Sequence, residues 1–115
     1  MTVAVDRAVL DEMVEMMGGM TEIVDDIVET YLQETPALVA TIADGSSVED
    51  VRMASHTLKS SSRSVGAVTL GDLAEVIENA ARDGSLDGVA DAMAAVSPSY
   101  DEAAALLANW QSIDA

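Results

Sequence analysis

The chain has 115 residues, half of them hydrophobic and only 3 % aromatic, which predicts one domain over residues 1–115 with a core of aliphatic side chains. A formal net charge of −16 disfavours nucleic acid and anionic membranes as partners, and the absence of cysteine excludes disulfides, zinc–thiolate sites and cysteine nucleophiles. Because the sequence has neither an apolar run of about 18 residues nor a signal-peptide pattern, we expect a soluble, cytoplasmic, monomeric protein.

Two helices are predicted in the N-terminal part of the chain. The first, over residues 6–17, follows apolar positions spaced three and four apart and stops at the glycine pair 18–19. The second starts at Thr21 as the capping residue, and its apolar stripe runs to Gly45. Pro36 lies inside this stripe and is predicted to kink the helix without ending it.

The third and fourth helices are predicted in the middle of the chain. A capping box that begins at Ser46 or Ser47 starts the third helix, which is predicted to run to about Val65. Gly66 then supplies a left-handed stop, and the fourth helix fits residues 69–82.

The last helix is predicted to begin near Ser85 or Leu86 and to continue to Trp110, with the segment around Pro98 as a candidate break. The sequence shows no strand alternation, repeat or low-complexity linker. Four long helices with short turns and a short helix at one end predict an all-α, antiparallel four-helix bundle. Such a bundle is mainly a scaffold, so function must be sought in its exposed residues.

The most informative segment surrounds the single histidine. Arg52, Lys59 and Arg63 lie close to His56, and no Asp or Glu occurs from residue 51 to 71, although the chain has 21 acidic residues. With about 100° per residue, these four side chains fall on one face of the third helix, away from its apolar stripe. The pattern predicts an exposed imidazole in a surrounding that suits an anion.

Other uses of a lone histidine fit less well. Metal binding is disfavoured because the chain has no second His and no Cys, and the nearby charges are positive. A Ser-His-Asp hydrolase is disfavoured because neither a nucleophile elbow nor an acidic partner accompanies the imidazole. Ser60 is predicted to face outward one turn from His56, where it leaves room for a bulky group, whereas Ser61 and Ser62 are predicted to allow close approach of another helix.

The segment Ala54-Ser55-His56-Thr57-Leu58-Lys59-Ser60-Ser61-Ser62-Arg63-Ser64-Val65-Gly66-Ala67 resembles the signature of histidine-containing phosphotransfer (HPt) domains, which act in bacterial two-component phosphorelays. The family pattern is roughly His-x-Leu-Lys-Gly-Ser-(Ser/Ala), followed by a Gly ten residues after the His, and the chain matches it at His56, Leu58, Lys59, Ser61 and Gly66. Ser60 departs from the pattern, because the family most often has Gly there. The likeness extends over nearly the whole chain.

The resemblance implies that His56 is phosphorylated and that Lys59, with Ser60 beside it, stabilises the phosphoryl group. It implies a shuttle between aspartates of receiver domains, one in a hybrid histidine kinase and one in a response regulator. The chain would have no kinase activity and no cofactor of its own, and the receiver domain would supply Mg²⁺. Arg82 matches a position where some members carry an assisting basic residue. The residues expected to dock the partner are Arg52, Met53, Arg63, Ser64 and Arg82.

Two other functions remain open from the sequence. The first is an acidic helical adaptor that docks a receiver domain or a basic protein without being phosphorylated. The second is an enzyme with His56 as general base, which ranks lower because no substrate pocket chemistry surrounds it. Phosphate labelling measured together with partner binding separates the adaptor from the phosphotransfer protein.

Overall fold

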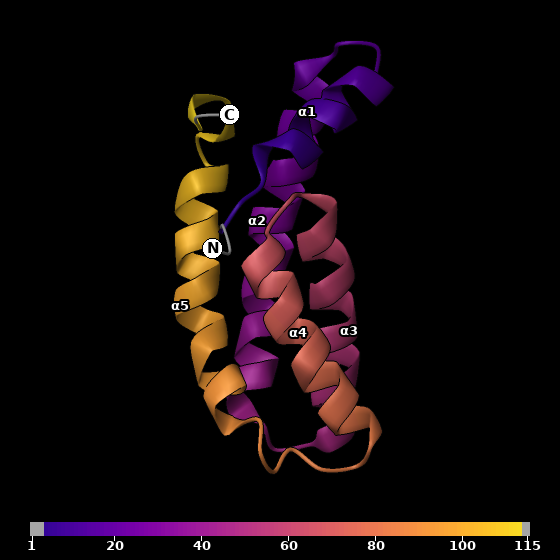
Figure 1. The fold of residues 1–115 in the computed structure, drawn as a ribbon, viewed down its shortest axis with the longest axis vertical. Helices are drawn as coiled ribbons and strands as arrows, with labels where there is room; N and C mark the ends of the chain where they lie inside the picture. The colour runs from indigo at the N-terminus through magenta and orange to yellow at the C-terminus, as the bar shows by residue number, and fades with distance from the viewer. Residues whose placement is uncertain (1–3, 114–115) are drawn as a thin grey trace.

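The structure, a computed structural model, describes residues 4–113, and this part of the chain forms helices and turns without any β-strand. Figure 1 shows the long helices side by side and alternating in direction, with a short helix at the end where the first long helix begins. The helices are α1 (Arg7–Met16), α2 (Thr21–Asp44), α3 (Val48–Ser64), α4 (Val68–Arg82) and α5 (Ala90–Leu107), followed by a 3₁₀ turn, η1 (Trp110–Ser112).

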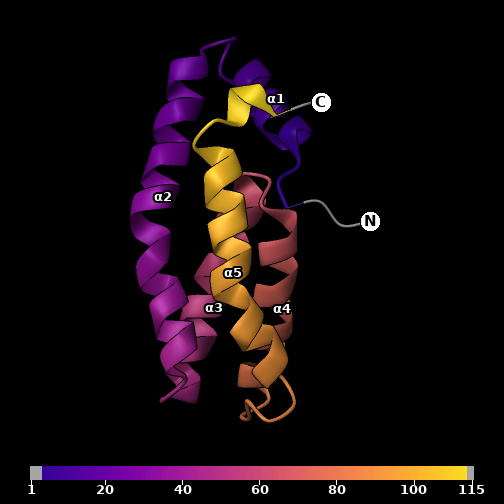
Figure 2. The same ribbon diagram turned by 90° about the vertical axis from the view of Figure 1, so that its left-hand side faces the viewer.

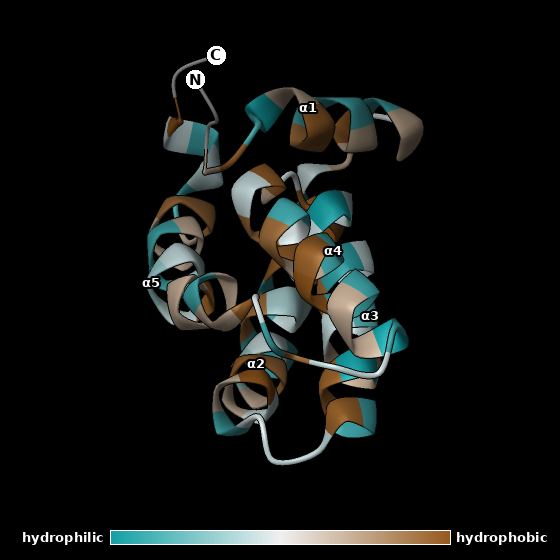
Figure 3. Ribbon diagram, turned by 60° about the horizontal axis from the view of Figure 1, so that its bottom comes forward, coloured by the Kyte–Doolittle hydropathy of each residue, from teal (hydrophilic) through white to brown (hydrophobic). Residues whose placement is uncertain are grey.

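The core lies between the four long helices. Helix α3 packs against α2 on one side and α4 on the other, while α5 contacts both α2 and α4, as the second view confirms (Figure 2). Hydrophobic and hydrophilic residues alternate around the helices (Figure 3), the pattern of amphipathic elements with one buried face. Each fully buried Leu or Ile contributes roughly 1.5–3 kcal/mol. The largest aliphatic side chains in the core are Leu10, Ile42, Leu58, Leu70, Ile77 and Leu107.

The predicted helix starts are confirmed for α1 and α3 and corrected for α2. The Asp6 side chain accepts the N–H of Ala8 at 3.0 Å before α1. The Oγ of Ser47 accepts the N–H of Asp50 at 3.2 Å and so caps α3. Thr21, however, is the first helical residue of α2, and the residue before it, Met20, makes no side-chain capping hydrogen bond.

Helix α2 continues through Pro36, as predicted. Proline has no N–H, so the carbonyl of Leu32, four residues earlier, loses its helical donor. The hydroxyl of Tyr100, on α5, donates a hydrogen bond to this carbonyl at 3.2 Å. The proline therefore costs the helix one internal hydrogen bond and gives it a contact with its neighbour.

Both predicted ends of α5 need correction: the helix ends at Leu107, and Trp110 belongs to the separate 3₁₀ turn η1. The helix begins at Ala90, several residues after Ser85, because the preceding segment forms a turn in which Gly88 has a φ of 87°. It also runs through Pro98 without a break. None of the helices within residues 4–113 combines the length and apolar character needed to cross a membrane.

Candidate functional site

His56 lies on the exposed face of α3, as the helical wheel predicted. The inward face of this helix is formed by Val51, Ala54, Ser55, Leu58 and Ser62, all buried. The His56 side chain is 59 % exposed. Lys59, one turn further along, is half-buried, with 21 % of its side chain exposed. The imidazole is therefore accessible to a binding partner, whereas the nearby ammonium group is packed against the surface of the protein.

The imidazole has an acidic partner, Glu78, so the expectation that none accompanies it is wrong. Glu78 comes from α4 and is 1 % exposed, and its Oε2 lies 2.7 Å from Nδ1 of His56. A helical wheel of α3 cannot reveal this contact, because the two residues are 22 positions apart in the chain. The acid-free segment around His56 is supplied with negative charge by the neighbouring helix.

The same carboxylate binds two further cations. Oε1 of Glu78 lies 2.6 Å from Nζ of Lys59, and Oε2 lies 2.8 Å from Nη2 of Arg82, one turn along α4. Burial raises the pKa of Glu78, but the hydrogen bonds from Lys59 and His56 outweigh burial and hold this pKa below its usual value. Glu78 is therefore an ionised carboxylate at neutral pH.

An ionised carboxylate determines which nitrogen of the ring carries the proton. Both of its oxygens only accept hydrogen bonds, so Nδ1 of His56 must be the donor at this 2.7 Å contact. In the neutral ring the lone pair then resides on Nε2. This arrangement leaves Nε2 as the nitrogen of the exposed ring whose lone pair is free in the neutral form. Residues 4–113 contain no group of three or more His, Asp or Glu side chains arranged to hold a metal ion.

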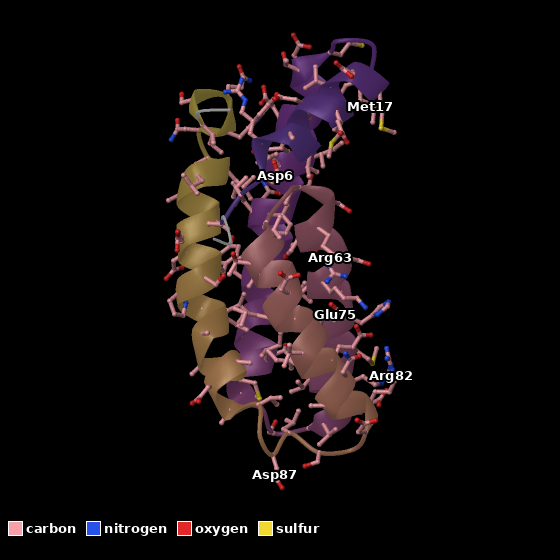
Figure 4. All side chains as sticks on the ribbon, viewed as in Figure 1. Asp6, Met17, Arg63, Glu75, Arg82 and Asp87 are labelled. Atoms are coloured by element: carbon pink, nitrogen blue, oxygen red, sulfur yellow. The ribbon has the colours of Figure 1, made fainter. Side chains whose placement is uncertain are left out.

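The other basic residues of α3 are also paired with acids. Nε of Arg52 donates to Oε2 of Glu49 at 3.0 Å, and Nη2 of Arg63 donates to Glu75 of α4 at 2.7 Å. The stem of Arg63 crosses Gly71, where an added Cβ would lie 2.9 Å from its Cγ. Figure 4 shows Arg63, Glu75 and Arg82 along one side of the molecule. The expected concentration of unbalanced positive charge is therefore absent from these described residues.

Small polar residues cover the rest of the exposed surface of α3. Ser60 and Ser64 are exposed, and the Oγ of Ser64 donates to the carbonyl of Ser60 at 2.9 Å. The Oγ of Ser61 likewise donates to the carbonyl of Thr57 at 2.9 Å. Met53 stands out as a large exposed apolar side chain on this helix. A partner can therefore approach α3 closely beside His56.

An apolar groove runs between α2 and α3, and the sequence did not reveal it. Its lining from α2 includes Ile27, Tyr31 and Leu38, with Glu34 at the polar part of the wall. Its lining from α3 includes Thr57, the residue next to His56. The groove therefore extends the exposed face of α3 toward α2, on the side away from α4.

Comparisons with known proteins agree with this arrangement. The model of the Hpt domain family matches residues 26–112, so the chain belongs to that family, and its role is phosphotransfer in phosphorelays. In fold, the chain is similar to histidine-containing phosphotransfer protein B (HptB) from Pseudomonas aeruginosa PAO1, with a TM-score of 0.82, 18 % sequence identity and 95 % of each chain covered. No curated protein sequence matches the chain.

Proposed function

We propose that His56 is the phosphorylated residue and that the chain shuttles a phosphoryl group between aspartates of two receiver domains, one in a hybrid histidine kinase and one in a response regulator. The observation that supports this most directly is the exposed imidazole whose Nδ1 is held by the buried Glu78, 2.7 Å away. That contact leaves the lone pair of Nε2 for the attack. The chain is then an intermediate carrier in a phosphorelay: it accepts and donates a phosphoryl group and has no kinase activity of its own.

The proposed transfer forms one bond and breaks one bond at phosphorus, and no proton leaves the site. Nε2 of His56 attacks the phosphorus of an aspartyl phosphate, an N–P bond forms, and the P–O bond to the aspartate breaks. The aspartate leaves as a carboxylate with the electron pair of the broken bond. Transfer to the second receiver domain reverses these events. The receiver domain would supply Mg²⁺, and this chain would contribute no cofactor.

Lys59 and Arg82 are the cations proposed to stabilise the phosphoryl group. Both contact Glu78, which itself contacts the imidazole, so both ammonium and guanidinium groups lie near the reacting ring. An arriving phosphoryl group adds negative charge and attracts them further. Ser60 is exposed one turn from His56, and its small side chain leaves space for the phosphoryl group and the partner.

The receiver domain is proposed to dock on the exposed face of α3. Met53 and Ser64 offer exposed surface there, and the groove toward α2 can take an apolar side chain of the partner. Arg52 and Arg63 remain proposed docking residues, since their guanidinium groups are partly exposed even though each is paired with an acid. We also propose that α2–α5 serve as an antiparallel four-helix bundle, extended by α1, in a monomeric cytoplasmic protein.

The test uses a phosphorylated receiver domain as donor and the His56→Gln variant as acceptor. The wild type should gain label that is labile in acid and stable in alkali, and His56→Gln should gain none. Glu49→Gln is a matched control, because it introduces the same residue type on the exposed face of the same helix. Label on His56→Gln would refute the assignment. Stable binding of receiver domains with no label on the wild type would favour the adaptor function.

A further inference from the structure

The charges of the four long helices divide the bundle into two sides. Every Lys and Arg of the chain except Arg7 lies on α3 or α4, and each is paired with a carboxylate of those same two helices. Helices α2 and α5 contain no Lys or Arg. Within residues 4–113, none of their carboxylates forms an ion pair. The side of the bundle made by α2 and α5 is therefore negative, and the described residues do not neutralise it.

A groove of about 450 Å³ lies on this negative side, between α2 and α5. Figure 2 shows the two helices beside each other, with the turn η1 at their upper end. The exposed residues Asp25 and Glu29 of α2 line the groove. Its other lining residues are apolar: Val28, Leu32, Leu107, Ala108 and Trp110. This α2–α5 groove therefore places an apolar surface next to carboxylates that lack an ion-pair partner in the described part of the chain.

The end of the groove at η1 is held in place by hydrogen bonds. Nε1 of Trp110 donates to Oδ1 of Asp25 at 2.8 Å, and Nε2 of Gln111 donates to the same oxygen at 3.2 Å. Trp110 is only 5 % exposed, so its ring is packed against the protein. The groove is thus formed before any partner arrives, which lowers the cost of ordering on binding.

We propose that the α2–α5 groove is a docking surface for a segment of a partner protein, an amphipathic helix with apolar side chains on one face and Lys or Arg beside them. The apolar side chains would enter the groove, and the basic ones would pair with Asp25, Glu29 and the other carboxylates of α2 and α5. This inference goes beyond the proposed function and does not rest on it.

The charge of the chain selects this occupant over others. A second copy would bring a formal net charge of −16 toward the same acidic helices, which disfavours self-association through the groove. Nucleic acid and anionic membranes would be repelled in the same way. A basic amphipathic segment, in contrast, supplies both the apolar surface and the cations that the groove lacks.

The α2–α5 groove is separate from the His56 site. The contacts of His56, Lys59 and Arg82 with Glu78 are all made between or within α3 and α4. The groove is lined by α2, the end of α5 and η1. A partner in the groove therefore leaves the imidazole accessible, and the chain can stay bound to that partner while a receiver domain contacts His56.

The test titrates the wild type with a short amphipathic peptide that carries leucines on one helical face and lysines on the other. Trp110 is the single tryptophan of the chain and lines the groove, so its fluorescence should change and saturate as the peptide binds. Binding should weaken when the ionic strength is raised from about 0.05 M to about 0.5 M. A peptide with glutamates in place of the lysines should not bind. No saturable change, or equal binding of both peptides, would overturn the inference.

Two pairs of variants locate the binding. Ala108→Arg puts a cation into the groove and should weaken binding on the order of tenfold, whereas Ala94→Arg adds the same charge near the other end of α5 and should not. Glu29→Gln should weaken binding about threefold. Glu34→Gln removes the same charge from the groove between α2 and α3 and should have less effect. Equal losses within each pair would show attraction to net charge alone and refute the assignment.

Two further measurements test the occupant and the separation from His56. Sedimentation equilibrium that shows a wild-type dimer, dissociated by Ala108→Arg, would assign the groove to a second copy and contradict the proposal. Peptide at saturation should leave transfer of label from a phosphorylated receiver domain unchanged, and a block in proportion to occupancy would disprove the separation. A wild type that takes no label refutes the proposed function, whereas the peptide titration still decides the role of the groove.

Discussion

Helix α3 is flanked by two buried polar clusters. They differ in charge and in whether they include a group that is exposed to solvent. On the α4 side, the ionised Glu78 gathers three nitrogen groups, one of which belongs to a half-exposed imidazole. On the α2 side, the hydroxyls of Tyr31 and Ser62 share a hydrogen bond of 2.8 Å, and both residues are buried. The first cluster opens to solvent, and the second closes within the protein.

The difference separates a polar cluster that we propose supports phosphoryl transfer from one that supports the packing of α2 against α3. Burial raises the pKa of Tyr31 to about 12, so its hydroxyl stays neutral. The hydroxyl of Thr35 donates to the backbone carbonyl of Tyr31 at 2.5 Å, so this buried hydroxyl also has a hydrogen-bond partner. Tyr31 and Thr35 line the apolar groove between α2 and α3, but the described cluster at Tyr31 offers a partner no charged or nucleophilic atom. The Glu78 cluster, in contrast, bears charge and ends on a nucleophilic nitrogen.

The largest effect that sharpens this comparison is expected for Lys59→Ala. Loss of the ammonium group should slow phosphoryl transfer on the order of tenfold to a hundredfold, because it removes one of the charges proposed to stabilise the phosphoryl group. Arg82→Ala should have a smaller effect, since its side chain is 57 % exposed and its charge is better screened. Transfer rates and circular dichroism of both variants check this. A Lys59→Ala variant that loses its helical signal would show that Lys59 serves the fold.

On the α2 side, Tyr31→Phe should change stability without changing chemistry. The variant leaves the buried hydroxyl of Ser62 without its partner and should lower the free energy of unfolding by about 1–2 kcal/mol. Urea denaturation measures this loss, and transfer assays should give the wild-type rate. A large loss of transfer with unchanged stability would break the distinction between the two clusters.

The smallest effect is expected on stability when the pH is lowered. This effect should differ between a buried carboxylate and an exposed one. The pKa of Glu78 is lowered from its ordinary value of 4.5, so its contribution to stability is present above that pH and is lost as the pH falls through the lower, folded-state value. The stability difference between wild type and Glu78→Gln should therefore narrow in acid. The pKa of Glu49 is also lowered, but its side chain is 63 % exposed, so solvent weakens its ion pair. The stability difference between the wild type and Glu49→Gln should therefore narrow less in acid. Equal narrowing in both variants would contradict the account.

The sequence predicted the features that depend on a single helix. The apolar spacing of α3 placed Leu58 inside and His56 outside, and Ser47 marked where this helix starts. It could not predict Glu78, because pairing between helices depends on how they pack. For the same reason, the acid-free segment around His56 suggested unbalanced positive charge, although Glu75 and Glu78 reach it from α4.

The predicted helix boundaries that were wrong lie where the geometry of a turn outweighs the apolar periodicity of the sequence. The expected start of the last helix near Leu86 followed the apolar pattern, but the left-handed Gly88 delays the helix to Ala90. The candidate break near Pro98 did not occur. The predicted continuation through Pro36 did, and the hydroxyl of Tyr100 compensates the carbonyl that the proline leaves without a donor.

The most direct test of the central claim is to determine which nitrogen carries phosphorus in the wild type. The chain, with nitrogen-15 in its single histidine, is phosphorylated by a receiver domain, and the nitrogen–phosphorus coupling is measured by NMR. Coupling of phosphorus to Nε2 of His56 is the predicted result, because Glu78 holds the proton on Nδ1. Coupling to Nδ1, or phosphorus bound to any other residue, would contradict the account.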